Sequence, residues 1–164
     1  ILPFNDYSGD YSGSTYLTTL TGDEGSGSIV KPYVRGYAVD ENSIFFYAGT
    51  VDEDRTDRNL YKIKATFEGS KTVGVVKLSA ENELIKLEVG KEASYNVSEV
   101  PDESLPYLTH QYIMINNIQY TFVDYTSIPG SEVSYTVTGG LTLERKINTQ
   151  ISDPDYKFIW EVKE

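Results

Sequence analysis

Residues 111–123 read Gln-Tyr-Ile-Met-Ile-Asn-Asn-Ile-Gln-Tyr-Thr-Phe-Val, and this stretch decides the fold class. On both sides of Asn116-Asn117, apolar and polar side chains alternate with the period of a β-strand that has one buried face. Asparagine tolerates the positive φ angles that a two-residue type I′ turn requires. The stretch therefore predicts a β-hairpin around Asn116-Asn117. Its two strands share one apolar face, formed by Ile113, Ile115, Ile118, Tyr120 and Phe122.

The same two-residue period continues along most of the chain, and turn signals such as Gly139-Gly140 and Asp153-Pro154-Asp155 separate the segments. Segments with clear alternation are 60–67, 83–89, 133–138 and 156–162. Further strands are expected at 14–20, 33–39, 43–50, 72–79 and 141–148. Residues 99–110 leave room for a short helix or a long loop, and Pro101 and Pro106 favour the loop.

These segments indicate an all-β, antiparallel protein of about ten short strands, because half-buried alternating strands are typical of antiparallel sheets. We expect a two-sheet β-sandwich that forms a single β domain over residues 1–164. The alternative is a calycin-like β-barrel. The sandwich is preferred because about ten strands exceed the eight of such a barrel.

Composition excludes several classes of protein and site. A net charge of −11 repels phosphate backbones, so we expect no nucleic-acid partner. The apolar runs are only a few residues long, whereas a membrane-spanning helix needs about 20 residues, so no membrane span is expected. The chain has no cysteine, which excludes thiol catalysis, disulfides and thiolate metal sites. No sequence feature calls for a cofactor.

The beginning of the sequence suggests an exported protein. The chain starts at Ile1, its only methionine is Met114, and a Tyr-, Ser- and Gly-rich stretch follows. We expect the mature part of a protein of the cell envelope or extracellular space, behind a removed signal or a lipid anchor.

Tyr7-Ser8-Gly9-Asp10-Tyr11-Ser12-Gly13 resembles the Tyr-x-Gly-x-Tyr-x-Gly opening strand of uncharacterised exported lipoprotein families, domains of unknown function, from gut bacteria. The resemblance implies an all-β fold, described for some of these families as a calycin-like barrel and for others as a β-sandwich. It also implies anchoring at the cell envelope. It implies no established activity and no catalytic residues.

The acidic run 52–57 is the most concentrated candidate for a metal site. Calcium takes six to eight oxygen ligands, often from acidic loops, and Asp52, Asp54 and Asp57 could supply three of them. Arg55 and Arg58 offset the charge of this run, and a solvated loop that joins two strands is the alternative interpretation.

Histidine and tyrosine give weaker signals. His110 is the only histidine, no Gly-x-Ser-x-Gly motif accompanies it, and a structural or surface role is expected for it. The 14 tyrosines suit half-exposed sheets and contact surfaces, including platforms that stack on sugar rings. Most tyrosines fall on expected core faces, whereas Tyr7, Tyr11 and Tyr16 are less clearly buried.

The leading hypothesis is a non-enzymatic envelope or extracellular domain that binds or scaffolds a carbohydrate or another protein. The second hypothesis is a small-molecule carrier of the barrel type, which needs an apolar cavity of several hundred Å³. The third is a glycoside hydrolase with a carboxylate pair, which needs a cleft holding two acids and a raised pKa on one of them.

Overall fold

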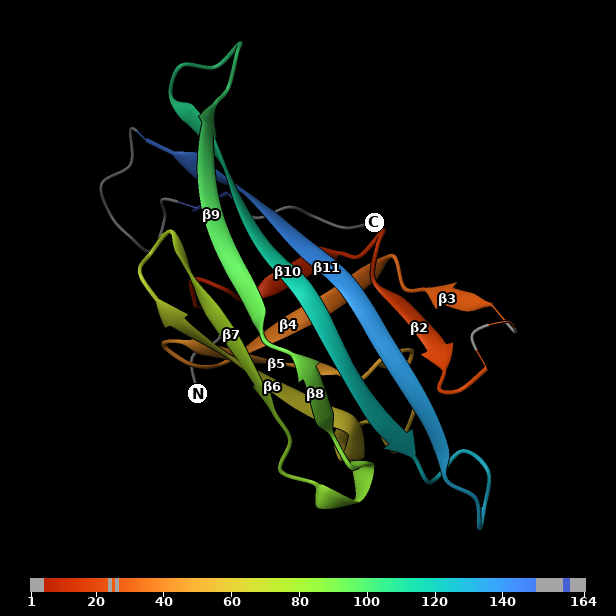
Figure 1. Ribbon diagram of the computed structural model, residues 1–164. Coiled ribbons are helices and arrows are strands. Elements are labelled where there is room, and N and C mark those ends of the chain that lie inside the picture. The colour runs from red at the N-terminus through yellow and green to blue at the C-terminus, as the bar shows by residue number, and fades with distance from the viewer. Residues whose placement is uncertain (1–4, 24, 26, 150–157, 160–164) are drawn as a thin grey trace.

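The computed structural model describes residues 5–23, 25, 27–149 and 158–159. Strands dominate this part of the chain, with short 3-10 helices η2 and η3 between them (Figure 1). The strands are β1 Gly9–Ser12, β2 Leu17–Leu20, β3 Ser28–Val30, β4 Tyr33–Asp40, β5 Ser43–Tyr47, β6 Lys62–Gly69, β7 Val73–Ser79, β8 Glu88–Lys91, β9 Ala93–Pro101, β10 Leu108–Asp124, β11 Val133–Asn148 and β12 Phe158–Ile159. The 3-10 helices are η2 Arg58–Tyr61 and η3 Glu83–Ile85.

The described strands form one closed antiparallel barrel. Eight of them pair in the ring β1-β4-β5-β6-β7-β9-β10-β11, which closes because β11 pairs with β1 as well as with β10. Strands β2, β8 and β12 pair along β11 or β10 outside the ring, and β3 pairs with β2. The all-β antiparallel prediction is confirmed, whereas the two-sheet sandwich is wrong. Alternation along a strand shows which face is buried, but it does not show which strands pair.

The predicted hairpin at residues 111–123 is also wrong, because β10 runs through it without a turn (Figure 1). Asn117 does adopt the left-handed conformation, with φ 61°, but within a β-bulge. The register shifts there: Ile115 lies opposite Leu141, and Ile118 lies opposite Gly139. One extra residue flips the alternation, so the predicted apolar face is nevertheless buried as a unit, with Ile113, Ile115, Ile118, Tyr120 and Phe122 all in the core.

The partner strand β11 is continuous as well, and the predicted turn at Gly139-Gly140 is wrong. These glycines lie opposite the bulge of β10. A Cβ at Gly139 would lie 1.9 Å from the carbonyl oxygen of Thr15, and φ there is 129°. Glycine at 139 therefore lets the segment that precedes β2 lie directly on the bent barrel wall.

Segment 83–89 differs from expectation, and segment 99–110 agrees with it only in its middle. Most of segment 83–89 is not strand: residues 83–85 form η3, where the Asn82 side chain accepts a hydrogen bond from the N–H of Leu84 at 3.1 Å. Lys86 then takes a left-handed φ of 49°, and β8 begins only at Glu88. Residues 102–107 are the loop that the prolines favoured, after β9 has extended to Pro101. The prediction for 153–162 lies outside the described residues except at β12.

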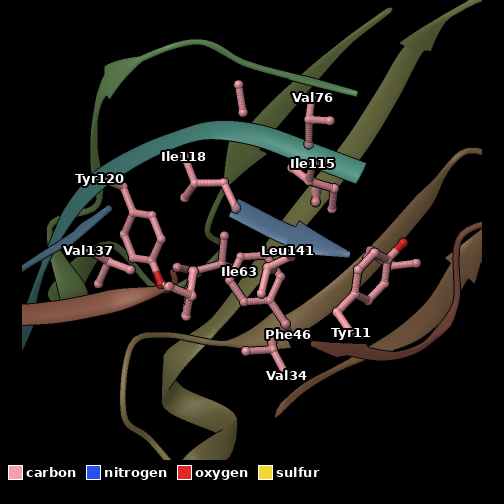
Figure 2. Packing of buried hydrophobic residues seen from close by; sticks show 14 of the residues in the cluster. Tyr11, Val34, Phe46, Ile63, Val76, Ile115, Ile118, Tyr120, Val137 and Leu141 are labelled. Carbon is pink, nitrogen blue, oxygen red and sulfur yellow. The ribbon is translucent and has the colours of Figure 1, made fainter. Parts of the chain in front are cut away.

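Buried side chains, most of them from the ring strands, fill the interior of the barrel (Figure 2). Residues Tyr61, Ile63, Ala65 and Phe67 of the alternating segment 60–67 are all buried, as expected. Tyr11 and Tyr16, which the sequence left unassigned, are core residues too. The hydroxyl of Tyr16 lies 2.5 Å from that of Tyr120, which also accepts a hydrogen bond from the N–H of Gly49 at 2.9 Å. Burial raises the pKa values of Tyr16 and Tyr120, so both phenols stay neutral hydrogen-bonding groups.

Candidate functional site

The outer surface of β4 and β5 carries a cluster of aromatic side chains. Along β4, Tyr37 precedes buried Ala38, and along β5, Phe45 and Tyr47 flank buried Phe46. Because side chains alternate across a strand, the buried residues place these three rings on the solvent side of the barrel. We call Tyr37, Phe45 and Tyr47 the outer aromatic cluster.

The register of the sheet brings the three rings together. Tyr37 lies directly opposite Phe45, and their rings stack with centroids 4.9 Å apart and planes 19° apart. Tyr47 meets Tyr37 and Phe45 edge-on, at centroid distances of 6.0 and 5.9 Å. All three side chains are half-buried, so part of each ring remains accessible to a ligand.

Charged side chains border the outer aromatic cluster. The Lys62 ammonium lies 4.5 Å from the centroid of the Phe45 ring, and the Arg35 guanidinium lies 5.9 Å from that of Tyr37. Arg35 also donates two hydrogen bonds to the carboxylate of Asp10, at 2.8 and 3.1 Å. The pKa of Arg35 is raised, and its hydrogen bonding to Asp10 is the largest cause. The cluster thus combines apolar faces with fixed hydrogen-bond donors.

Two hollows adjoin the outer aromatic cluster. One, of about 630 Å³, lies beside Phe45, Lys62 and Lys64 and reaches residues 79–82. The other, of about 470 Å³, lies beside Tyr47 and Arg35 and reaches the acidic loop. Both volumes fall in the range of about 300–1,000 Å³ that is usual for ligand sites.

The acidic loop is held by protein groups. Asp57 accepts two hydrogen bonds from Arg55, at 2.9 and 2.8 Å, and one from the hydroxyl of Thr126 at 2.5 Å. The bonds from Arg55, then that from Thr126, hold the pKa of Asp57 well below its usual value. Asp52 forms an ion pair with Lys31 at 3.4 Å.

Asp52 and Asp54 both line the smaller hollow, whereas Asp57 is drawn to Arg55 and Thr126. Within the described ranges, no group of three His, Cys, Asp or Glu side chains could hold a metal ion. Calcium binding by Asp52, Asp54 and Asp57 stays a prediction. Comparing the melting temperature in calcium and in chelator tests it.

His110 lies near the beginning of β10, opposite Lys146 of β11 and Val100 of β9. Its Nε2 lies 2.7 Å from a carboxylate oxygen of Asp102, and its Nδ1 lies 3.3 Å from one of Glu144. The contact with Asp102, followed by that with Glu144, raises the pKa of His110. These partners tie the loop at 102–107 to the barrel, which agrees with the structural role expected for His110.

The sequence did not reveal the outer aromatic cluster. Residues 44–47 read Ile-Phe-Phe-Tyr, a run in which aromatic residues occupy both faces of the strand. The available signal was the alternation in Tyr33-Val34-Arg35-Gly36-Tyr37, which puts the large polar and aromatic side chains on one face. Only the pairing of β4 with β5 brings Tyr37 to Phe45.

Fold and surface together define an all-β barrel domain with a solvent-facing aromatic cluster. A family model that describes a C-terminal domain matches residues 1–142, and the chain therefore belongs to this family of C-terminal domains. No curated protein matches the chain. In the described ranges, no helix has the length and apolar character needed to cross a membrane.

Solved structures from Bacteroides are similar to the chain. An auxiliary nutrient binding protein from Bacteroides thetaiotaomicron is 46% identical with a TM-score of 0.87, and the match covers 98% of this chain and 53% of that one. A multidomain protein from Bacteroides ovatus that includes a domain of unknown function is 32% identical with a TM-score of 0.85, over 97% and 56% of the two chains.

A protein of unknown function from Bacteroides ovatus is 37% identical with a TM-score of 0.84, over 93% of this chain and 50% of that one. The chain thus spans about half the length of the solved structures that it matches. These relatives agree with the expected resemblance to uncharacterised domains of gut bacteria. They are described as binding proteins or as proteins of unknown function, not as enzymes.

Proposed function

We propose that this chain is a non-enzymatic carbohydrate-binding domain and that the outer aromatic cluster is its contact surface. The observation that carries the proposal is the placement of Tyr37, Phe45 and Tyr47 together on the solvent side of β4 and β5. Aromatic rings present flat apolar faces to the C–H faces of sugars, and the tyrosine hydroxyl and nearby charged groups bond to sugar hydroxyls.

The solved relatives support a binding role. One of them, nearly half identical over almost the whole of this chain, is described as an auxiliary nutrient binding protein. We propose that this chain also serves as a binding domain and that it forms one β domain over residues 1–164. We further propose that it belongs to an exported protein of the cell envelope. A lipid anchor ahead of Ile1 belongs to the same proposal.

The small-molecule carrier has less support. A carrier needs an apolar cavity inside the barrel. The described interior is instead packed with large side chains, including Tyr16, Tyr61, Tyr120 and Phe122. The two hollows beside the outer aromatic cluster lie on the outer surface of the barrel. A ligand bound there would contact the outside of the barrel wall and would not enter the core.

The hydrolase alternative also has less support. A glycosidase general acid needs a raised pKa. The carboxyl groups of Asp40, Asp57, Asp102 and Asp124 all have lowered pKa values. Hydrogen bonds lower all four, and at Asp124 they outweigh burial, which raises the pKa. These carboxylates suit structural ion pairs and not proton donation.

Affinity electrophoresis tests the proposal. Wild-type protein is run through native gels that contain xylan, arabinan, mannan, starch or pectin, beside a Phe45→Ala variant. A Tyr112→Ala variant, which removes a half-buried ring from β10, serves as the matched control. We expect at least one polysaccharide to retard wild type and Tyr112→Ala but not Phe45→Ala. Equal mobility of all three proteins in every gel, or equal retardation of all three, would overturn the proposal.

A further inference from the structure

The two hollows lie at opposite ends of the outer aromatic cluster. The smaller hollow contacts Arg35 on β4 and Tyr47 on β5. The larger hollow contacts Val39 on β4 and Phe45 on β5. Tyr37 lies between Arg35 and Val39 along β4, so the rings form a bridge from one hollow to the other.

The resulting strip is long compared with one sugar ring. From Arg35 to Val39 the strand advances four residues, or about 13 Å at about 3.3 Å per residue. Lys64, on the neighbouring β6, lies opposite Phe45 and extends the strip across a third strand. Tyr33, 59% exposed and also on the smaller hollow, extends it at the other end.

The strip also touches a ligand from one side only, because it lies on the outer wall of a barrel. Pockets for single small molecules enclose about 70–90% of the ligand surface. A single sugar laid on the half-buried rings of Tyr37 and Phe45 is contacted on one face alone. Useful affinity then has to be summed over several linked units that occupy both hollows and the rings between them.

We infer that this surface binds an internal segment of a glycan chain, several sugars long, and not a free monosaccharide. The inference rests on the proposed function and adds the class of ligand: a polysaccharide that runs from the Tyr33 end, over the outer aromatic cluster, to the Lys64 end.

Isothermal titration calorimetry with size-graded oligosaccharides tests the inference. The probes run from monosaccharide to octasaccharide and are prepared from the polysaccharide that retards the protein in the gels. We expect the dissociation constant to fall at least about tenfold between disaccharide and hexasaccharide and then to level off. Tyr33→Ala and Lys64→Ala, at opposite ends of the strip, should each weaken hexasaccharide binding.

The outcomes separate the inference from the function on which it rests. If monosaccharide and hexasaccharide bind equally tightly, the inference is wrong while carbohydrate binding stands. If only one end variant weakens hexasaccharide binding, the ligand occupies a single hollow, and the inference is again wrong. If no polysaccharide or oligosaccharide binds, the proposed function fails and the inference fails with it.

Discussion

A buried carboxylate anchors the loop that borders the candidate binding surface. Asp124, at the end of β10, accepts hydrogen bonds from the hydroxyls of Ser127 and Tyr61, at 2.6 and 2.8 Å, and from Arg55 at 3.2 Å. Arg55 in turn holds Asp57. Burial raises the pKa of Asp124, but these hydrogen bonds outweigh it and hold the pKa well below its usual value.

We therefore expect Asp124→Asn to lower the free energy of unfolding by about 2 kcal/mol at neutral pH, because charged hydrogen bonds are lost. A carboxyl group with a lowered folded pKa stabilises the protein above its unfolded pKa of about 3.9. That contribution is lost as pH falls further, through the folded pKa. Urea unfolding of both proteins between neutral and acidic pH should show their difference shrinking at low pH. A difference that does not change with pH would contradict this account of Asp124.

The contribution of His110 to stability depends on pH in the opposite direction to that of Asp124. The pKa of His110 is raised by Asp102 and Glu144, and Lys146 lies opposite it on β11. A histidine with a raised folded pKa stabilises the protein fully below its unfolded pKa of about 6.5, and the effect is lost as pH rises through the folded pKa. We expect His110→Gln to be less stable than wild type at about pH 5.5 and equally stable at about pH 9. Thermal melts of both proteins at each pH measure the difference in stability. Equal melting temperatures of wild type and His110→Gln at the lower pH would refute this role of His110.

At the scale of elements, the bulge in β10 decides which side chains enter the core. Asn116 and Asn117 together oppose one residue of β11, so the alternation shifts by one between Ile115 and Ile118. Without the shift, Ile118 and the residues after it would turn to solvent. The bend is shared with β11, where Gly139 admits the Thr15 carbonyl.

Substitution at Asn117 tests this role. Its φ of 61° is easy for glycine and strained for a β-branched residue. We expect Asn117→Gly to be as stable as wild type or more stable, and Asn117→Val to be less stable than Asn117→Gly by about 1–2 kcal/mol. Urea unfolding of the two variants gives the difference. Equal stability would mean that the left-handed conformation is not required.

The bulge also explains what sequence reading recovered and what it missed. A two-residue turn and a one-residue bulge both place Ile118 on the same face as Ile115. The apolar face was therefore predicted correctly, although the turn that was expected to form it does not exist. The segment 83–89 alternated as well, but Asn82 caps a 3-10 turn there instead. Strand β9, Ala93–Pro101, was not predicted, although Ala93, Tyr95 and Val97 alternate there with Ser94, Asn96 and Ser98.

For the whole molecule, barrel closure depends on the short strand β1. Arg145 of β11 donates hydrogen bonds to the backbone carbonyls of Asn5, Asp6 and Ser8, and so holds the segment ahead of β1. The Tyr7 ring stacks on Phe67 with centroids 4.0 Å apart. These contacts join residues far apart in sequence, which is why local alternation could not distinguish a barrel from a sandwich or reveal the outer aromatic cluster.

We expect Arg145→Met to loosen this closure. The buried Ser8 carbonyl would lose its Arg145 donor, at a cost of about 1–3 kcal/mol, and the chain around β1 would open more often. Amide hydrogen exchange should accelerate at residues 5–12 more than along β5 and β6. Uniform acceleration over the barrel would mean that Arg145 supports the fold generally and not the closure.

The most direct test of the proposed binding surface is an aromatic-ring NMR titration with the polysaccharide or oligosaccharide that binds best. We expect ligand to shift the ring resonances of Tyr37, Phe45 and Tyr47. The resonances of core rings such as Tyr16 and Tyr120, and of Tyr112 on β10, should remain unchanged. Shifts confined to core rings or to Tyr112, or no shifts under any ligand, would contradict it.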